Sequence, residues 1–352
     1  MTHFLNEKRT PLFRQSLHQQ APELVELERL IVTHPSRLEY RVIETVEYNE
    51  QAFPIYAIDL GQHQPGKPAL LICGGVHGIE RIGVQVVIAQ LKVWLERLKW
   101  ERSLQQCFNE INVTVLPIIN PVGLFLNRRS NGRGVDLMRN APIDSQQGSF
   151  LVSGQRFSPR LPWYRGKEDR LELENLSLEK EIKRLSSLSP LLISIDCHSG
   201  FGMRDRLWFP YAYRRRPMRD IAPVVALKLL WENSYPNHQY IFEPQSNHYL
   251  THGDLWDYFY KCFGRKDCTF LPLTLEMGSW NWVRKRPLQL FRVGGLFNPL
   301  VPHRQQRALR RHLPLMDFLR HAVHSYQQWL PNDQEKQHLT QVAQSLWYRM
   351  QE

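Results

Sequence analysis

Short apolar runs alternate with amphipathic stretches along most of this chain. The short runs have the length of strands, and the longer stretches repeat apolar residues at helical spacing. The predicted strands are 38–48, 53–60, 69–73, 112–119, 191–197 and 270–276. The first two alternate apolar and polar residues, which is typical of an antiparallel pair, whereas the later runs are typical of buried strands.

The amphipathic stretches predict helices between and after these strands. They are 22–32, 82–98, 171–188, 218–231, the short aromatic-rich 253–263, and a helical region from 303 that breaks at 331–333 and continues to Met350. This alternation predicts an α/β fold with a mixed, mainly parallel central sheet and helices on both faces. We expect one domain over residues 1–300 and a helical C-terminal extension over residues 301–352.

Four polar residues stand at the ends of three predicted strands. His77 and Glu80 lie in HGIE after strand 69–73, His198 follows strand 191–197, and Glu276 ends strand 270–276. Residues at such strand ends face the crevice where open α/β sheets bind their ligands. Two His and one Glu form a common zinc set, and a second Glu can act as a base toward water. A single His at a strand end is more often a packed residue, so the prediction depends on the combination.

A long polar loop from 120 to about 170 strengthens this interpretation. It contains NPVG at 120–123 and RRSNGRGVDLMRN at 128–140. Together with HGIE, the later His and TLE at 274–276, these segments resemble the zinc metallocarboxypeptidases of the carboxypeptidase A type. The spacing around RSNGRGVDL is most similar to the bacterial murein tripeptide amidase branch, and the resemblance covers roughly residues 65–280.

The resemblance implies a role for each catalytic position. His77, Glu80 and His198 match the ligands of one zinc ion. Glu276 matches the general base that takes a proton from zinc-bound water and passes it to the leaving amine. Arg129 matches the arginine that polarises the scissile carbonyl, although a solvated basic loop is the alternative for this region.

The resemblance also implies residues that bind substrate. Arg139 matches the arginine that holds a terminal carboxylate. Tyr249 in YLTHG matches a tyrosine that caps the substrate, with a partly buried aromatic residue as an equal alternative. Asp254 lies near the position that selects the side chain, but a helix N-cap role is favoured for it. Met138 replaces the family's Asn, so carboxylate binding rests on Arg139 alone or gains an amide from Asn140.

Asp196 and His252 are further candidates, as groups that orient the metal ligands. Cys197 adjoins His198 but is expected to point into packing, because adjacent strand residues face opposite sides. The five Cys residues form no CxxC motif and fit reduced thiols. No secretory signal is evident at the N-terminus, so we expect a cytoplasmic protein.

The chain has 352 residues and a net charge of +11, but its basic runs are scattered and no nucleic-acid-binding motif accompanies them. No apolar stretch approaches the about 18 residues of a membrane span, and we expect neither a nucleic-acid nor a membrane partner.

The sequence therefore predicts a zinc hydrolase that cleaves an amide bond at or near the C-terminus of a peptide or murein-type peptide. The alternative is an N-acyl amino acid deacylase of the aspartoacylase and succinylglutamate desuccinylase type. A non-catalytic binding protein would lack a ligand or the base, and all of these are present.

Overall fold

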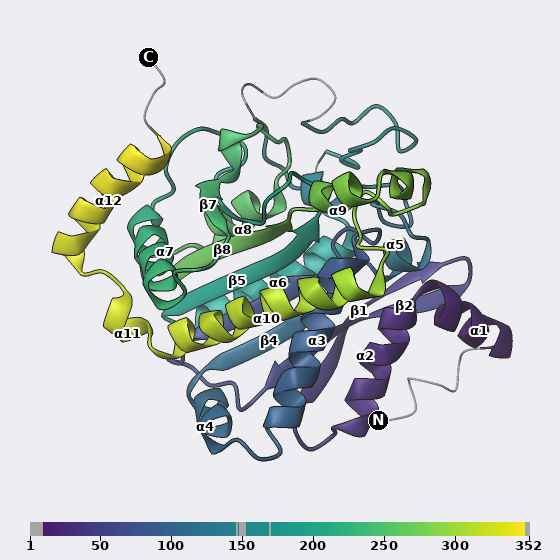
Figure 1. Ribbon diagram of the computed structural model, residues 1–352, viewed down its shortest axis with the longest axis horizontal. Helices are drawn as coiled ribbons and strands as arrows, with labels where there is room; N and C mark the ends of the chain where they lie inside the picture. The colour runs from purple at the N-terminus through teal and green to yellow at the C-terminus, as the bar shows by residue number, and fades with distance from the viewer. Residues whose placement is uncertain (1–9, 146, 148–152, 169, 349–352) are drawn as a thin grey trace.

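One eight-stranded sheet organises the computed structural model, which describes residues 10–145, 147, 153–168 and 170–348 (Figure 1). The strand order is β1-β2-β4-β3-β5-β8-β6-β7. The strands are β1 (Glu39–Tyr48), β2 (Gln51–Leu60), β3 (Ala69–Gly74), β4 (Asn112–Leu116), β5 (Leu191–Ser199), β6 (Arg206–Phe209), β7 (Ile241–Pro244) and β8 (Thr269–Met277).

The centre of the sheet is parallel and its flanks are mixed. β4, β3, β5 and β8 pair in parallel, whereas β1 with β2, β2 with β4 and β8 with β6 are antiparallel. Every residue of β3 and β5 is buried, because helices cover both faces of the sheet there. The predicted mixed, mainly parallel sheet is confirmed.

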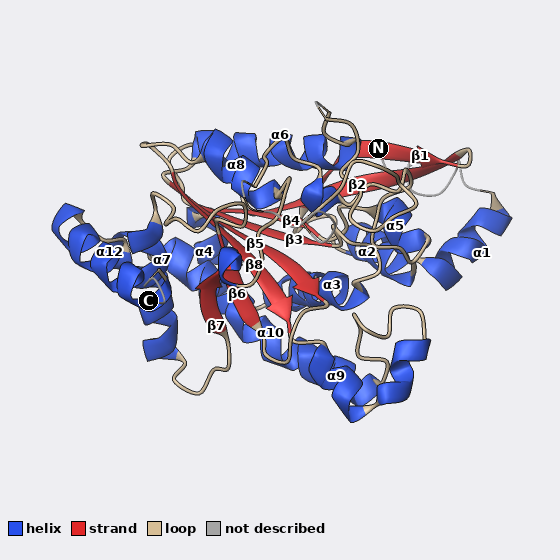
Figure 2. Cartoon of the chain, turned by 90° about the horizontal axis from the view of Figure 1, so that it is seen from above, coloured by secondary structure: helices blue, strands red, loops and turns tan. Residues whose placement is uncertain are grey.

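Helices cover both faces of this sheet (Figure 2). On one side lie α6 (Leu173–Leu188) and α8 (Leu255–Phe263); on the other lie α2 (Pro22–Thr33), α3 (Arg81–Arg97) and α10 (Pro302–His324). The other helices are α1 (Pro11–Gln20), α4 (Arg102–Glu110), α5 (Pro121–Phe125), η2 (Leu137–Arg139), α7 (Ile221–Ser234), η3 (Gln245–Asn247), α9 (Trp280–Lys285), η4 (Pro287–Phe291), α11 (Tyr326–Trp329) and α12 (Asp333–Trp347).

Several elements differ from the sequence-based expectation. The short strands β6 and β7 and the helices α1 and α4 were not predicted, because short or mostly polar segments carry little periodic signal. The region expected as a loop over 120–170 contains α5 and η2, and its positions 146, 148–152 and 169 lie outside the described residues. The predicted last helix is α12, which ends at Trp347, and Met350 also lies outside the described residues.

The register of the central strands brings distant residues to one edge. Cys73 of β3 pairs with Asp196 of β5, and two residues further His198 pairs directly with Glu276 of β8. Because parallel strands in register end together, the segments that follow β3, β5 and β8 meet at the same crevice. This edge holds the candidate site.

Candidate metal centre

The loop after β3 reaches the crevice through a tight turn. Gly75 has a φ of +68°, a conformation that glycine adopts without strain. At Gly78 a Cβ atom would lie 1.9 Å from the carbonyl carbon of Gly123, so only glycine fits against α5. This packing places His77 in the loop and Glu80 directly before α3.

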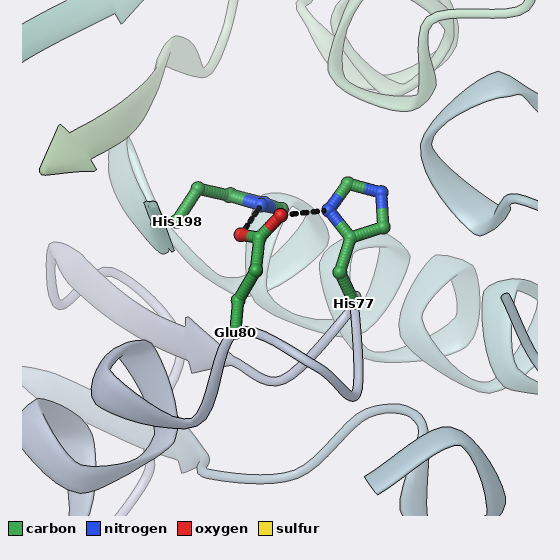
Figure 3. Close-up of side chains that lie close together, drawn as sticks. All are labelled: His77, Glu80 and His198. Atoms are coloured by element: carbon green, nitrogen blue, oxygen red, sulfur yellow. Dashed lines mark hydrogen bonds and ion pairs between the residues drawn. The ribbon is translucent and has the colours of Figure 1, made fainter. Parts of the chain in front are cut away.

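His77, Glu80 and His198 converge on one point (Figure 3). Nδ1 of His77 lies 2.9 Å from Oε1 of Glu80, and Nδ1 of His198 lies 3.1 Å from Oε2 of the same carboxylate. One ligand atom from each residue lies within 4.8 Å of the others, and all three side chains are buried. The three residues that the sequence predicts as metal ligands are therefore brought together.

Two aspartates hold the outer nitrogens of these imidazoles. Nε2 of His77 lies 3.0 Å from Oδ1 of Asp136, and Nε2 of His198 lies 2.6 Å from Oδ2 of Asp196. Trp256 donates its indole N–H to the same oxygen of Asp196 at 2.9 Å. A carboxylate that accepts the Nε2 proton leaves Nδ1 with its lone pair, the form in which imidazole binds a metal.

Charge pairing governs the protonation of this cluster. Burial alone would raise the pKa of Glu80, but His77 and His198 outweigh it and lower that pKa. Burial also opposes ionisation of Asp136, whose pKa is nevertheless held well below its ordinary value by Arg129, His77 and Arg139. Both carboxylates are therefore ionised at neutral pH.

These residues fit a zinc ion by their chemistry. Two imidazole nitrogens and a carboxylate form a common donor set for catalytic zinc, which keeps a further position open. The carboxylates of Glu80, Asp136 and Asp196 contact two imidazoles that must be neutral to bind metal. Arg129 forms ion pairs with Glu80 and Asp136, and Arg139 lies 3.9 Å from Asp136.

Glu276 and Arg129 lie beside this cluster. Glu276 accepts a hydrogen bond from the backbone N–H of Phe201 at 2.8 Å, and burial together with Glu80 raises its pKa to about 8. Arg129 donates from Nε to Asp136 at 2.9 Å and from a terminal nitrogen to Glu80 at 3.1 Å. Both side chains line a cavity of about 460 Å³ that also contains the three candidate ligands.

The same cavity contains a second cationic group. Arg139 is only 5% exposed, and its Nε has no hydrogen-bond partner among the described residues. Tyr249 and Met138 line the cavity with it. Burial raises the pKa of Tyr249, so its hydroxyl is neutral and can donate a hydrogen bond. A buried guanidinium with an unused donor is suited to a carboxylate ligand.

Two predicted substrate residues are placed differently from each other. Asp254 lines the cavity and also accepts the backbone N–H of Asp257 at 2.9 Å as the N-cap of α8, while burial raises its pKa to about 6. Asn140 does not join the cavity-lining residues. Its side chain donates to the carbonyl of Arg165 and accepts the backbone N–H of Glu172 at 2.7 Å. It therefore cannot supply the amide that Met138 lacks, because the loop around it already uses both of its polar groups.

The structure also shows which of the remaining candidates contact the metal ligands. Asp196 contacts a ligand imidazole as expected, whereas His252 lies beside Ser145 and Asp144 and touches none of the ligands. Cys197 is buried outside the cluster, as predicted. Arg133 pairs with Glu172 and does not line the cavity, whereas Arg129 of the same loop contacts Glu80 and Asp136.

Sequence reasoning missed Asp136 and the aromatic walls of the cavity. Asp136 lies within the GVDL segment three residues before Arg139, so its position in that motif was an available signal. The walls include Trp163, Phe201 and Phe297, which come from three separate loops. No local pattern marks these aromatic residues, because only the packing of those loops brings them to the cavity.

Comparisons with known proteins agree on one family. The profile described as zinc carboxypeptidase matches residues 13–281. Carboxypeptidase SOL1 of Arabidopsis thaliana is 30% identical over 95 residues, which is 26% of this chain and 19% of that protein. Carboxypeptidase E of Caenorhabditis elegans is 24% identical over 157 residues, 41% of this chain and 31% of that protein, so the matches span less than a third of these relatives. The crystal structure of thrombin activatable fibrinolysis inhibitor shares the fold, with a TM-score of 0.65 at 20% identity over 89% of this chain and 80% of that one.

Proposed function

The chain belongs to the zinc carboxypeptidase family, and from this premise we propose that it hydrolyses an amide bond at or near the C-terminal end of a peptide or murein-type peptide. It is a zinc metallocarboxypeptidase-like hydrolase, and the substrate and mechanism are our proposal. One observation carries it: a candidate base, Glu276, and two arginines, Arg129 and Arg139, line the same cavity as the metal set.

Glu276 is the proposed proton carrier. Zinc held by His77, Glu80 and His198 would act as a Lewis acid that polarises the scissile carbonyl and lowers the pKa of water. The Glu276 carboxylate accepts a proton from the attacking water and donates it to the leaving amine, so one water is consumed for each amide bond broken. Its pKa of about 8 lies close enough to neutral pH for both transfers.

Arg129 is proposed to stabilise the negative charge that develops on the carbonyl oxygen. Its hydrogen bonds to Asp136 and Glu80 hold the guanidinium in one orientation before substrate arrives. A donor that is already oriented needs little reorganisation as the charge forms, which is why such groups are effective in catalysis.

Arg139 and Tyr249 are proposed to hold the terminal carboxylate. The family's Asn is replaced here by Met138, whose thioether donates no hydrogen bond, and Asn140 is occupied elsewhere. Recognition then depends on the Arg139 guanidinium with the neutral Tyr249 hydroxyl near it. We expect amidation of a substrate's C-terminus to reduce kcat/KM on the order of 100-fold, the effect of losing a charged hydrogen bond.

Metal content and hydrolysis, measured on the same preparations, test this proposal. Wild type, Glu276→Gln and the control Glu47→Gln, an exposed acid on β1, are purified without chelator and analysed for zinc. Each is then assayed for release of C-terminal amino acids from peptides, a murein tripeptide and N-acyl amino acids. The proposal expects about one zinc in all three proteins and hydrolysis of peptides by wild type and Glu47→Gln only.

Two results would contradict the proposal. If the purified protein lacked stoichiometric metal and added zinc restored no activity, a metal-dependent mechanism would be excluded. Turnover of N-acyl amino acids with no turnover of peptides would instead favour the deacylase alternative. Because Glu276→Gln keeps the size of the side chain, a loss of activity with retained metal reports on the carboxylate itself.

A further inference from the structure

A segment beside the cavity projects apolar side chains into solvent. We define the projecting segment as residues 280–293, which contain α9 and η4 (Figures 1 and 2). Its most exposed apolar side chains are Leu288 at 74%, Phe291 at 88% and Val293 at 75%. Large exposed apolar patches usually mark a surface that binds another molecule, whereas apolar side chains exposed singly do not.

The base of this segment is held firmly, so these side chains are not exposed by a loose chain end. The buried amide of Gln289 donates to the carbonyl of Gly295 at 2.6 Å. Asn298 donates to the carbonyl of Ile79 at 2.8 Å and accepts the backbone N–H of Ile82 at 3.0 Å. Gly295 and Asn298 follow the segment closely, so these bonds tie its C-terminal end to the turn that carries the candidate ligand Glu80.

The segment is also basic. Residues 277–316 contain eight Lys or Arg and no Asp or Glu. Four of these cations lie in the segment and are exposed, namely Arg284, Lys285, Arg286 and Arg292. Among the described residues, no acidic side chain lies within ion-pair distance of these four. The other four lie on α10, which is on the same side of the sheet as α9 (Figure 2).

The position of the segment links it to the cavity. Trp280 donates its indole N–H to the carbonyl of Gly200 at 2.9 Å, and its ring lies 5.7 Å from that of Phe201, which lines the cavity. Phe297, just beyond the segment, lines the cavity too. A surface bound by the projecting segment would therefore lie beside the entrance used by substrate.

We propose that the projecting segment docks this protein onto an anionic lipid surface. Leu288, Phe291 and Val293 enter the boundary between headgroups and acyl chains, and the four cations contact the anionic headgroups. A nucleic acid would be recognised by cations and stacking aromatic rings, and it offers little to the aliphatic Leu288 and Val293. The combination of exposed aliphatic groups and unpaired cations matches a lipid surface best.

This binding would be peripheral. No helix among the described residues has both the length and the apolar composition needed to cross a membrane. The sequence-based expectation of no membrane partner rested on the lack of a spanning segment. It did not consider the exposure of residues 288–293, which is a property of the folded chain.

Vesicle cosedimentation tests the proposal without any substrate, so the result does not depend on the proposed function. The full chain is mixed with vesicles of phosphatidylcholine alone or with added phosphatidylglycerol, at low and high salt. Wild type is expected to bind only the anionic vesicles, with affinity that falls as salt rises. Leu288→Ser with Phe291→Ser is expected to weaken binding by about tenfold or more, because two inserted apolar groups are removed.

A second variant set separates charge from apolar contact. Gln replacement of Arg284, Lys285 and Arg286 is expected to weaken binding on the order of 100-fold. Matched controls remove the same charge or apolar area elsewhere on the surface. They are Gln at Arg37, Arg102 and Arg160, and Ser at Leu12 and Trp100. Thermal unfolding of every variant verifies that it is folded.

Four outcomes would overturn the proposal. They are no vesicle binding by wild type, equal binding to neutral vesicles, equal loss in the control variants, and tighter binding to single-stranded nucleic acid through the same residues. A dimer that the Leu288→Ser and Phe291→Ser changes dissociate, found by sedimentation in the absence of vesicle binding, would assign the surface to a second copy of the chain instead.

Discussion

The candidate metal centre and the projecting segment are both rich in charge, but their charges have opposite surroundings. In the candidate metal centre the charges are buried, and partners within about 3 Å stabilise them, as Arg129 does for Glu80 and Asp136. In the projecting segment Arg284, Lys285 and Arg286 are exposed to water. Burial makes an unpaired charge costly, whereas water and salt screen an exposed one.

This difference predicts how each region responds to substitution. A change in the metal centre should have a large effect that depends on one atom, because each group has a defined partner. A change in the projecting segment should have a small effect on the folded protein and act mainly through the summed charge.

The largest expected effect is that of Glu276→Gln. An amide keeps the size of the side chain but cannot accept and release the proton, so we expect kcat to fall by about 10²–10⁴-fold. Steady-state kinetics on the best peptide substrate, with zinc content measured on the same preparation, checks this. An active Glu276→Gln protein with full zinc content would exclude Glu276 as the base.

Glu174, a buried acid outside the candidate metal centre, shows how burial affects a carboxylate whose pKa stays raised. Burial raises the pKa of Glu174 to about 7 from its ordinary 4.5. Between these values the folded state keeps the proton that the unfolded state has lost. The stabilising contribution is therefore complete below pH 4.5 and is lost as pH rises through 7, by up to about 3 kcal/mol.

Glu174→Gln should remove this pH dependence. As the pH rises from 4.5 to 8, the free energy of unfolding of Glu174→Gln should gain up to about 3 kcal/mol relative to that of wild type, because only wild type loses the contribution of the buried proton. Denaturant unfolding at several pH values measures the change, with the exposed Glu47→Gln as control. The same gain in Glu47→Gln, or parallel curves for Glu174→Gln and wild type, would contradict the assignment.

Asp196→Asn should weaken metal binding rather than remove it. Asp196 contacts His198 at Nε2 and touches no other candidate ligand, so its effect is to orient the imidazole. We expect zinc affinity to fall by about 10–100-fold, which competition with a chelator measures. Asp267→Asn, at an exposed acid on the loop before β8, is the control. Unchanged affinity in Asp196→Asn would show that the His198 imidazole is held without the Asp196 carboxylate.

The smallest expected effect belongs to the projecting segment. Replacement of Arg284, Lys285 and Arg286 by Gln should change the free energy of unfolding by about 0.5 kcal/mol or less per site, since exposed charges contribute little. The kcat/KM of this triple variant on a soluble peptide should stay within about twofold of the wild-type value. A large loss of stability would mean that these cations support the cavity wall.

Motif and periodicity together predicted which residues meet in the candidate metal centre. His77 and Glu80 are close in sequence, and His198 and Glu276 each end an apolar run, so local patterns place all four at strand ends. The parallel centre of the sheet followed from the alternation of strands and helices. Short strands such as β6 (Arg206–Phe209) lacked enough residues to show a period.

The sequence by itself thus determined the central strands, the helices that cover them and the candidate ligands. Only the tertiary structure decided that Asp136 contacts the His77 imidazole, that Asn140 faces a loop, and that Phe291 projects into solvent. The physical reason is the range of the interactions. Periodicity reports on neighbours along the chain, whereas hydrogen-bond partners and exposure depend on how distant segments pack.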